Sequence, residues 1–277
     1  MSTFTINGIE LYYEIEGNPQ SKEAIVFLNG VMASTNSWVN QVELFKKLGY
    51  KILLHDFKGQ LKSDKPLGPY TFHQHAFETA ALMQEVGIEK AHIVGTSYGG
   101  EVGLRMAIDF PVFVQSLTVI ASVSELDSLL ESHIDGWRNL CDTFDGETFF
   151  TGMMPTIYGS TYIRENRDLL RKRALAMKAF PEEYFIGQTY LYDTFLQDVD
   201  CTKELHLIQC PTLIVSGAED TLKPSKFSRI MKQGISRSEW IELPDSGHVA
   251  IFEQPDALNT CILGFIVKHR IETGVPV

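Results

Sequence analysis

Short apolar segments alternate with amphipathic helical segments over the first 122 residues, and this alternation restricts the fold more than any other feature. Strands are predicted over residues 9–15, 24–28, 51–56, 91–94 and 116–121, and helices over residues 37–48, 72–86 and 99–110. Nearly continuous apolar strands separated by helices are typical of a parallel sheet that is covered on both faces. We therefore predict an α/β fold, with a mostly parallel sheet flanked by helices.

The alternation stops after residue 122 and resumes near residue 208. One helical face is predicted in between, formed by Leu126, Leu129, Leu130, His133, Trp137, Leu140 and Cys141. Strand patterns return at residues 211–216 and 238–243, and a last helix is predicted over 255–270. The simplest interpretation is one core domain, residues 1–122 and 208–277, interrupted by a helical cap insertion over residues 123–207.

Composition argues against several functional classes. The 277 residues include 24 Lys and Arg against 35 Asp and Glu, a formal charge of −11, which disfavours binding of nucleic-acid phosphates as the main function. No apolar run approaches the roughly 20 residues that span a bilayer, and the N-terminus lacks the pattern of a secretory signal. The four cysteines show no Cys-x-x-Cys spacing, so neither a zinc ribbon nor a disulfide framework is predicted. We expect a cytoplasmic monomer or homodimer that binds neither nucleic acid nor membrane.

The first candidate catalytic residue is Ser97, in the sequence Gly-Thr-Ser-Tyr-Gly at positions 95–99. This motif follows a predicted strand and precedes a predicted helix, so Ser97 would occupy a sharp turn with its hydroxyl raised at the helix N-terminus. Glycine suits both ends of the motif because a side chain at either position would crowd the turn. The strand–turn–helix context predicts a nucleophile.

Two more candidates follow later strands. Asp220 comes after the strand at 211–216, and His248 comes after the strand at 238–243. Both therefore fall at the carboxyl edge of the sheet, where active sites of open α/β sheets form. Glu219 is an alternative acid. The order serine, acid, histidine is the order associated with this elbow motif, and it predicts a catalytic triad.

Together these motifs resemble the α/β-hydrolase fold superfamily, specifically the small bacterial esterases and lactonases that carry a helical cap. The resemblance covers nearly the whole chain and is weakest in the cap. It implies that Ser97 is the nucleophile and His248 the general base. It also implies that Asp220 orients the imidazole and stabilises the imidazolium.

The resemblance also implies an oxyanion hole made of two backbone N–H groups. One belongs to Tyr98, directly after the nucleophile, and the other to Val31, in the segment that corresponds to the family's His-Gly-x sequence. This chain has Asn29 where the family usually has His, which makes the loop geometry and substrate preference less predictable. Residues 56–63 resemble the family's Asp-x-Arg-Gly-x-Gly-x-Ser motif, with Lys for Arg and Leu for the second Gly. We interpret that motif as mainly structural.

Serine at the elbow argues against haloalkane dehalogenases and epoxide hydrolases, which use Asp there. We predict a cofactor-free serine hydrolase that acts on a small-molecule carboxylic ester with a small to medium acyl chain. The same residues could transfer the acyl group to an alcohol or to hydrogen peroxide, or hydrolyse a lactone. A non-catalytic ligand receptor on this fold is the alternative from a different class.

Three remaining features receive minor interpretations. His73 and His75 are two residues apart on a predicted helix and do not share a face, so no metal site is predicted. Glu101 is interpreted as a favourable charge near a helix N-terminus. The Phe, Tyr and Met residues of the insertion predict an apolar pocket, although the sequence does not indicate which of them line it.

Overall fold

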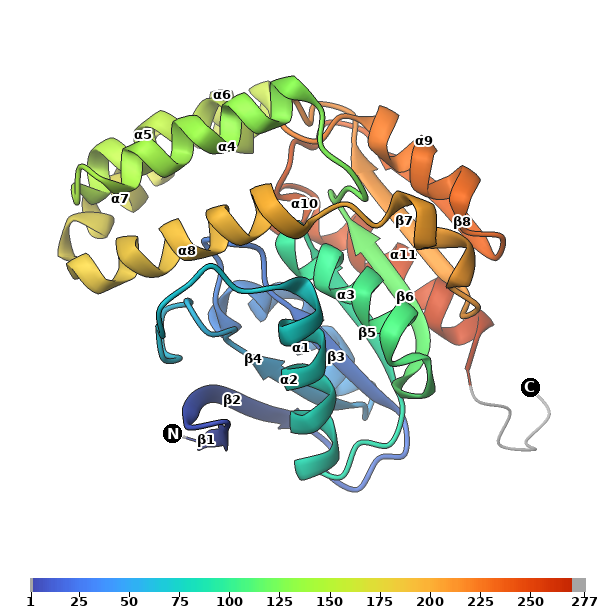
Figure 1. The fold of residues 1–277 in the computed structure, drawn as a ribbon. Coiled ribbons are helices and arrows are strands. Elements are labelled where there is room, and N and C mark those ends of the chain that lie inside the picture. Colours follow the sequence, from blue (N-terminus) through green and yellow to red (C-terminus); the bar gives the residue numbers. More distant parts are fainter. Residues whose placement is uncertain (1, 271–277) are drawn as a thin grey trace.

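Eight strands form one sheet in the order β1-β2-β4-β3-β5-β6-β7-β8 in the computed structural model, which describes residues 2–270 (Figure 1). The strands are β1 (Ser2–Ile6), β2 (Ile9–Gly17), β3 (Ala24–Leu28), β4 (Lys51–His55), β5 (Ala91–Thr96), β6 (Val114–Ile120), β7 (Thr212–Gly217) and β8 (Ser238–Leu243). Strands β3 to β8 pair in parallel, whereas β2 pairs antiparallel with β1 and β4. The predicted α/β fold with a mostly parallel sheet is confirmed, and β1 is a strand that the sequence analysis did not predict.

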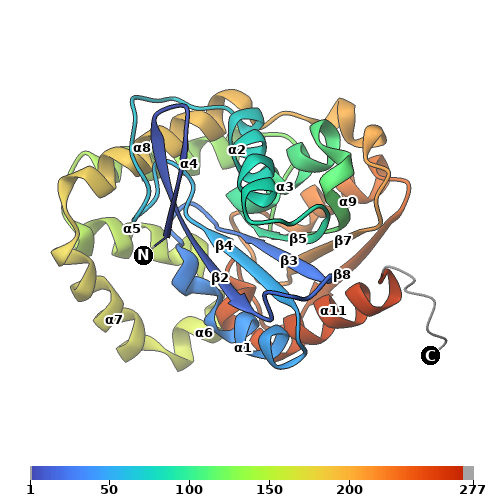
Figure 2. The same ribbon diagram turned by 90° about the horizontal axis from the view of Figure 1, so that it is seen from below.

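Helices cover both faces of this sheet. Figure 2 shows α1 (Val39–Lys47) and α11 (Pro255–Lys268) on one face, and α2 (Phe72–Glu85), α3 (Tyr98–Asp109) and α9 (Ser225–Gly234) on the other. The short helix α10 (Ala250–Glu253) precedes α11, and 3-10 turns cover Thr35–Trp38, Pro111–Phe113, Met177–Ala179 and Thr202–Leu207. Helix α9 was not predicted.

The central strands are buried on both sides, which explains their continuous apolar sequences. Along β3, Ile25 and Phe27 pack into the cluster that contains α1 and α11, whereas Val26 and Leu28 pack into the opposite cluster. Successive side chains of a strand point to opposite faces. A strand that is apolar at every position is therefore stable only when helices cover both faces.

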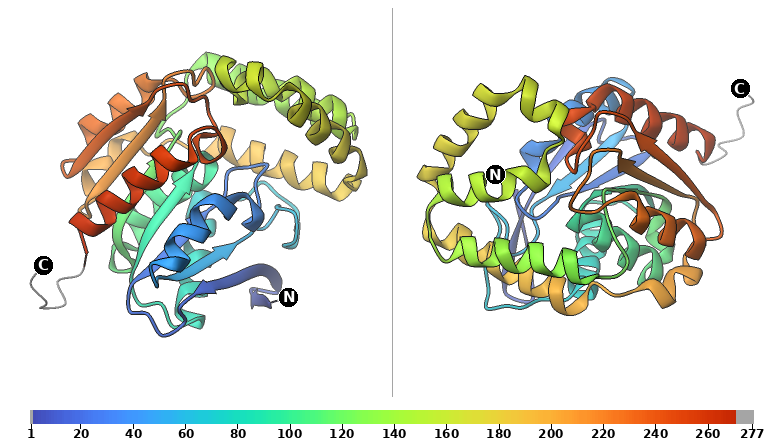
Figure 3. Two further views of the ribbon diagram at one scale, coloured as in Figure 1. Left: turned by 180° about the vertical axis from the view of Figure 1, so that it is seen from behind. Right: turned by 90° about the horizontal axis from the view of Figure 1, so that it is seen from above.

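A layer of helices lies over the carboxyl edge of the sheet (Figures 1 and 3). These helices come between β6 and β7 along the chain. The layer consists of α4 (Ser128–Cys141), α5 (Gly146–Ile157), α6 (Ser160–Glu165), α7 (Arg167–Ala176) and α8 (Glu182–Asp198), which we call the cap. The two connections of the cap to the core meet, because the Cys201 N–H donates to the Ser124 carbonyl over 2.9 Å. None of the helices in residues 2–270 is both long and apolar enough to cross a bilayer.

The buried face of α4 differs from the predicted one. Its buried residues are Leu130, Ile134, Trp137 and Cys141, spaced by four, three and four residues as a helical stripe requires. Leu129 is 59% exposed, so its inclusion in the predicted face was wrong. Leu129, His133 and Leu140 lie on one side of this stripe, and the predicted face omitted Ile134, which lies within it.

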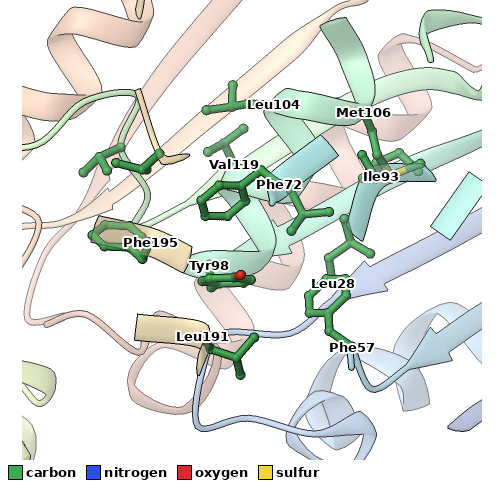
Figure 4. Close-up of a cluster of buried hydrophobic side chains, with 14 of the residues drawn as sticks. Leu28, Phe57, Phe72, Ile93, Tyr98, Leu104, Met106, Val119, Leu191 and Phe195 are labelled. Atoms are coloured by element: carbon green, nitrogen blue, oxygen red, sulfur yellow. The ribbon is translucent and has the colours of Figure 1, made fainter. Parts of the chain in front are cut away.

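The cap and the core share one hydrophobic cluster. Figure 4 shows Leu191 and Phe195 of α8 beside Tyr98, the first residue of α3. Tyr98 is fully buried, and its ring centroid lies 4.7 Å from that of Phe72 in α2. The start of the helix that follows the predicted nucleophile is therefore packed by the cap as well as by the core.

The buried His55 predicts a pH dependence of stability. Burial lowers the pKa of His55 to about 4, whereas a histidine in an unfolded chain titrates near pH 6.5. Below about pH 6.5 the unfolded chain therefore binds a proton that the folded chain does not, which reduces the unfolding free energy as the pH falls. Because Thr79 Oγ1 lies 3.1 Å from His55 Nε2, His55→Gln keeps a polar group near that hydroxyl and removes the titration.

We expect the unfolding free energy of His55→Gln to fall less steeply than that of the wild type between pH 6.5 and 5. The difference in slope should approach about 1.4 kcal/mol per pH unit, the limit for one proton. Urea denaturation at several pH values measures both slopes. Equal slopes would contradict the prediction.

Candidate active site

Ser97 lies on the turn between β5 and α3, in a backbone conformation that is rare for residues with a side chain. Its φ is 51° and its ψ is −122°, and such strain persists only where the surrounding structure holds it. The Ser97 N–H donates to the Ile120 carbonyl over 2.8 Å, and the Ser122 hydroxyl donates to the Ser97 carbonyl over 2.9 Å. Both bonds come from β6 and the loop after it, so the neighbouring strand fixes the turn.

Two glycines of the motif are required by close backbone approaches. A Cβ atom on Gly95 would lie 2.2 Å from the Gly99 carbonyl oxygen, and a Cβ atom on Gly99 would lie 2.1 Å from the Leu28 carbonyl oxygen. Such distances are far below van der Waals contact. The turn therefore packs directly against its own helix and against the end of β3.

The structure brings Ser97, Asp220 and His248 into one hydrogen-bonded chain. His248 Nε2 lies 2.9 Å from Ser97 Oγ, and His248 Nδ1 lies 2.9 Å from Asp220 Oδ2. The other oxygen of Asp220 accepts from the backbone N–H groups of Leu222 (3.0 Å) and Lys223 (2.8 Å). A neutral imidazole that donates from Nδ1 to Asp220 leaves Nε2 as an acceptor for the serine hydroxyl.

The alternative acid, Glu219, points to the cap. Its carboxylate accepts from the Thr161 hydroxyl over 2.6 Å and from the Thr161 N–H over 2.9 Å, at the start of α6. These hydrogen bonds lower the pKa of Glu219. Asp220, rather than Glu219, is thus the acid in contact with His248.

The loop that carries His248 is tied to the cap. The His248 N–H donates to the Ile157 carbonyl over 2.9 Å. One oxygen of the Glu253 carboxylate accepts from the N–H groups of Gly247 (2.8 Å) and Gly159 (3.0 Å). Burial raises the pKa of Glu253, and its hydrogen bonds to backbone N–H groups act in the opposite direction. The position of the cap therefore influences the position of the imidazole.

The predicted oxyanion donors lie beside the nucleophile. Val31 and Tyr98 line the same cavity as Ser97, and a Cβ atom on Gly30 would lie 3.5 Å from Ser97 Cβ. Within residues 2–270, neither the Val31 N–H nor the Tyr98 N–H donates a hydrogen bond. No acceptor among the described residues therefore occupies either N–H group, as the predicted role requires.

Asn29 has a clear structural role at the base of this loop. Its amide nitrogen lies 3.1 Å from Asp56 Oδ1, and its amide oxygen accepts from Trp38 Nε1 over 2.9 Å. Gln60 Nε2 also donates to the Gly30 carbonyl over 2.7 Å. Asp56 and Gln60 of the 56–63 motif, together with Trp38, thus hold the loop in place.

A cavity of about 410 Å³ lies between the cap and the core, beside Ser97 and His248. Its lining from the cap is mainly aromatic and apolar, and it includes Ile134, Trp137, Phe150, Ile157, Met177 and Tyr184. Among the described residues that line it, Arg173 and Lys223 are charged and none is acidic. In residues 2–270 no group of three or more potential His, Cys, Asp or Glu metal ligands occurs.

A buried ion pair that the sequence did not indicate lies beside Ser97. Lys223 Nζ lies 2.8 Å from Glu101 Oε1 and 3.3 Å from Ser97 Oγ, and both charged side chains are only 2% exposed. Glu101 also accepts from the Val123 N–H over 2.9 Å. The interpretation of Glu101 as a helix-end charge was therefore incomplete. No sequence pattern links two residues that lie 122 positions apart.

A serine on a strand–turn–helix elbow, with an acid and a histidine at later strand ends, is the pattern of the α/β hydrolases. The profile of the alpha/beta hydrolase fold family matches residues 23–255. The chain belongs to this family, which confirms the resemblance seen in the sequence.

Known proteins similar to this chain span several activities. RutD from Azorhizobium caulinodans, provisionally named a carbamate hydrolase, is 28% identical over 259 residues, covering 92% of this chain and 94% of RutD. The structure of MGS-M2, an alpha/beta hydrolase enzyme from a Medee basin deep-sea metagenome library, matches with a TM-score of 0.92 and 28% identity, covering 99% of this chain and all of MGS-M2. The enol-lactonase of Burkholderia xenovorans LB400 matches with a TM-score of 0.85 over 96% of this chain and all of that one. At 22% identity, this last likeness shows the fold alone.

The close approach at Gly99 predicts a large effect of one methyl group. In Gly99→Ala the new Cβ would collide with the Leu28 backbone, so the turn and the loop after β3 must separate. A misplacement of about 1 Å in a catalytic site can cost about 10²-fold in rate. We expect the rate of covalent modification of Ser97 by a fluorophosphonate to fall by about this factor, as followed by mass spectrometry.

Gly264→Ala is the matched control. Gly264 lies in α11, and no heavy atom would lie within 4 Å of a new Cβ there. This variant should keep the wild-type modification rate and gain about 0.5–1 kcal/mol of stability, the usual difference between Ala and Gly inside a helix. Wild-type reactivity of Ser97 in Gly99→Ala would contradict the proposed packing constraint.

Proposed function

We propose that this protein is a serine hydrolase that cleaves carboxylic esters with small to medium acyl chains. The observation that carries the proposal is the chain of hydrogen bonds from Asp220 through His248 to the hydroxyl of Ser97, at the edge of a mainly apolar cavity. A serine hydroxyl is a weak nucleophile unless an adjacent base accepts its proton. Here the base is in hydrogen-bond contact and its orientation is set by a buried carboxylate.

The first half of the proposed reaction forms an acyl-enzyme. Ser97 Oγ attacks the ester carbonyl carbon while His248 Nε2 takes the hydroxyl proton, and the carbonyl oxygen becomes an oxyanion. The Val31 and Tyr98 N–H groups stabilise this charge by hydrogen bonds. Collapse of the intermediate breaks the bond to the leaving alcohol, which receives the proton from His248.

The second half releases the acid. Water enters the position of the alcohol and attacks the acyl carbonyl, while His248 takes a proton from the water. The bond between the acyl carbon and Ser97 Oγ then breaks, and His248 returns the proton to Ser97 Oγ. Asp220 holds the imidazole in the same tautomer in both halves and stabilises the imidazolium.

The volume of the cavity favours a small to medium-sized substrate. Its volume of about 410 Å³ lies toward the lower end of the roughly 300–1,000 Å³ of ligand pockets. Aromatic and aliphatic side chains from the cap favour an apolar acyl or alcohol group. An alcohol or hydrogen peroxide could replace water in the second half, and acyl transfer is the alternative function on the same residues.

We expect the wild type to hydrolyse p-nitrophenyl esters and to be labelled at Ser97 by a fluorophosphonate, because both reactions need an activated hydroxyl. Activity should be highest for short and medium acyl chains and fall for long ones that exceed the cavity. Ser97→Ala should lose both labelling and turnover, since it removes the hydroxyl that is in hydrogen-bond contact with His248. Release of p-nitrophenol and mass spectrometry of the labelled protein measure these outcomes.

Two comparisons test the substrate class. The p-nitrophenyl carbamate should react more slowly than the acetate, since the nitrogen lone pair makes its carbonyl carbon less electrophilic; a faster carbamate would show that the ester assignment is wrong. Added alcohol or peroxide should not capture most of the acyl group. Ester turnover that persists in Ser97→Ala, or a wild type that resists labelling, would contradict the proposed mechanism.

A further inference from the structure

Lys223 is, with His248, a second side chain within hydrogen-bond distance of the Ser97 hydroxyl. Its Nζ atom lies 3.3 Å from Ser97 Oγ, 2.8 Å from Glu101 Oε1 and 4.6 Å from the centroid of the Phe195 ring. The side chain is almost fully buried and lines the cavity. A buried ammonium is stable only when a charge partner and hydrogen-bond acceptors compensate for lost hydration. Glu101 and Ser97 provide these contacts.

Two acid–base pairs thus converge on one hydroxyl oxygen. Asp220 orients His248, and Glu101 orients Lys223. The pairs are also joined through the backbone, because the Lys223 N–H donates to Asp220 while its side chain reaches Ser97. Glu101 is held by the Val123 N–H and lies in the first turn of the helix that begins after Ser97.

The direction of each hydrogen bond follows from the chemistry of the groups. An ammonium can only donate, so Ser97 Oγ accepts from Lys223 through a lone pair. The hydroxyl proton remains free to be donated to His248 Nε2. The two contacts are therefore compatible, and they polarise the O–H bond in the same sense.

We propose that Lys223 is a further catalytic residue, which donates a hydrogen bond to Ser97 Oγ while that oxygen gains negative charge, with Glu101 as its counter-ion. The inference rests on the proposed function. In acylation, Lys223 stabilises Oγ as its proton moves to His248. In deacylation, Oγ is the leaving group, and Lys223 stabilises it until His248 returns the proton. Lys223 transfers no proton in either half.

The observed distance agrees with this role. A contact of 3.3 Å is longer than the usual 2.9–3.0 Å of an N–H···O bond, so it can shorten when the attraction increases. A hydrogen bond with one ionised partner is already stronger than one between neutral groups, and the Coulomb attraction adds to it when the second partner also becomes charged. The contact therefore strengthens when charge develops on Oγ, which is the condition for lowering a reaction barrier.

A purely structural ion pair makes a different prediction. Replacement of a buried ion pair by uncharged side chains of similar volume is often neutral or stabilising, whereas removal of one charge leaves the other unpaired. The test therefore removes both charges together. In Glu101→Gln/Lys223→Met, a structural role predicts normal reactivity of Ser97, and a catalytic role predicts a slower reaction in a folded protein.

The experiment measures the second-order rate of phosphonylation of Ser97 by a fluorophosphonate, on the pH-independent plateau of each protein. This rate reports the nucleophilicity of Oγ without a deacylation step. We expect a decrease of about 10- to 100-fold in Glu101→Gln/Lys223→Met, the range for loss of a charge-assisted hydrogen bond. Glu101→Gln/Lys223→Gln, which keeps an uncharged N–H donor, should lie between this variant and the wild type. A thermal unfolding curve of each variant shows whether it is folded under the conditions of the rate measurement.

The pair Lys58–Glu78 provides the matched control. Its charged atoms lie 2.6 Å apart, both side chains are 5% exposed, and neither residue lines the cavity. Lys58→Met/Glu78→Gln therefore removes an equally buried pair and should leave the phosphonylation rate within twofold of the wild type. A similar decrease in this control would overturn the proposal, because the effect would then not depend on contact with Ser97.

The remaining outcomes are also decisive. Phosphonylation within twofold of the wild type in both Glu101/Lys223 double variants would overturn the role of Lys223 and leave the proposed function intact. If the Met variant does not fold, the Gln variant alone decides by the same criterion. A wild type that is not labelled at Ser97 would refute the proposed function itself.

Discussion

The contact between the nucleophile turn and the end of β3 sets the geometry on which the site depends. Gly99 packs so tightly against the Leu28 carbonyl that no side chain fits between them, and Gly30 lies beside Ser97, so the turn and the loop after β3 are in direct contact. In the sheet, Leu28 is the register partner of Gly95. One packing contact and one strand register thus bring Ser97 and Val31 to the lining of the same cavity.

The parallel sheet extends this alignment to the other strands. Thr96 pairs with Ile120, and Gly217 pairs with Leu243, so the segments that follow β5, β7 and β8 leave the sheet at one edge. Side chains that are far apart along the chain meet there because neighbouring parallel strands end at similar levels. The cap covers this edge and also contacts the loop of His248 through Ile157 and Gly159. It is therefore part of the support of the site as well as a wall of the cavity.

The buried carboxylates at the site each have specific donors, within a chain of formal charge −11. Asp220 accepts hydrogen bonds from backbone N–H groups and from His248, and Glu101 forms an ion pair with Lys223. Burial raises the pKa of Glu101, and the nearby ammonium opposes that change. Buried carboxylates of this kind persist because each has a specific donor, whereas the many surface carboxylates need only water. The net charge of the chain therefore says little about the potential inside the cavity.

The sequence by itself determined the layered fold and the position of the predicted nucleophile, Ser97. Alternating apolar segments predict strands and helices because burial requires them, and the glycines of the elbow indicate a backbone approach that no other residue allows. It also indicated Asp220 and His248, because their places after strands and their order along the chain are local features. The strand β1 and the helix α9 were missed, and the buried face of α4 was misassigned.

Only the tertiary structure decided between Asp220 and Glu219, because both follow the same strand and their directions depend on the packing of α6. It alone brought Glu101 and Lys223 to Ser97, since an ion pair between residues 122 positions apart forms through the folding of the whole sheet and leaves no periodic signal in the sequence.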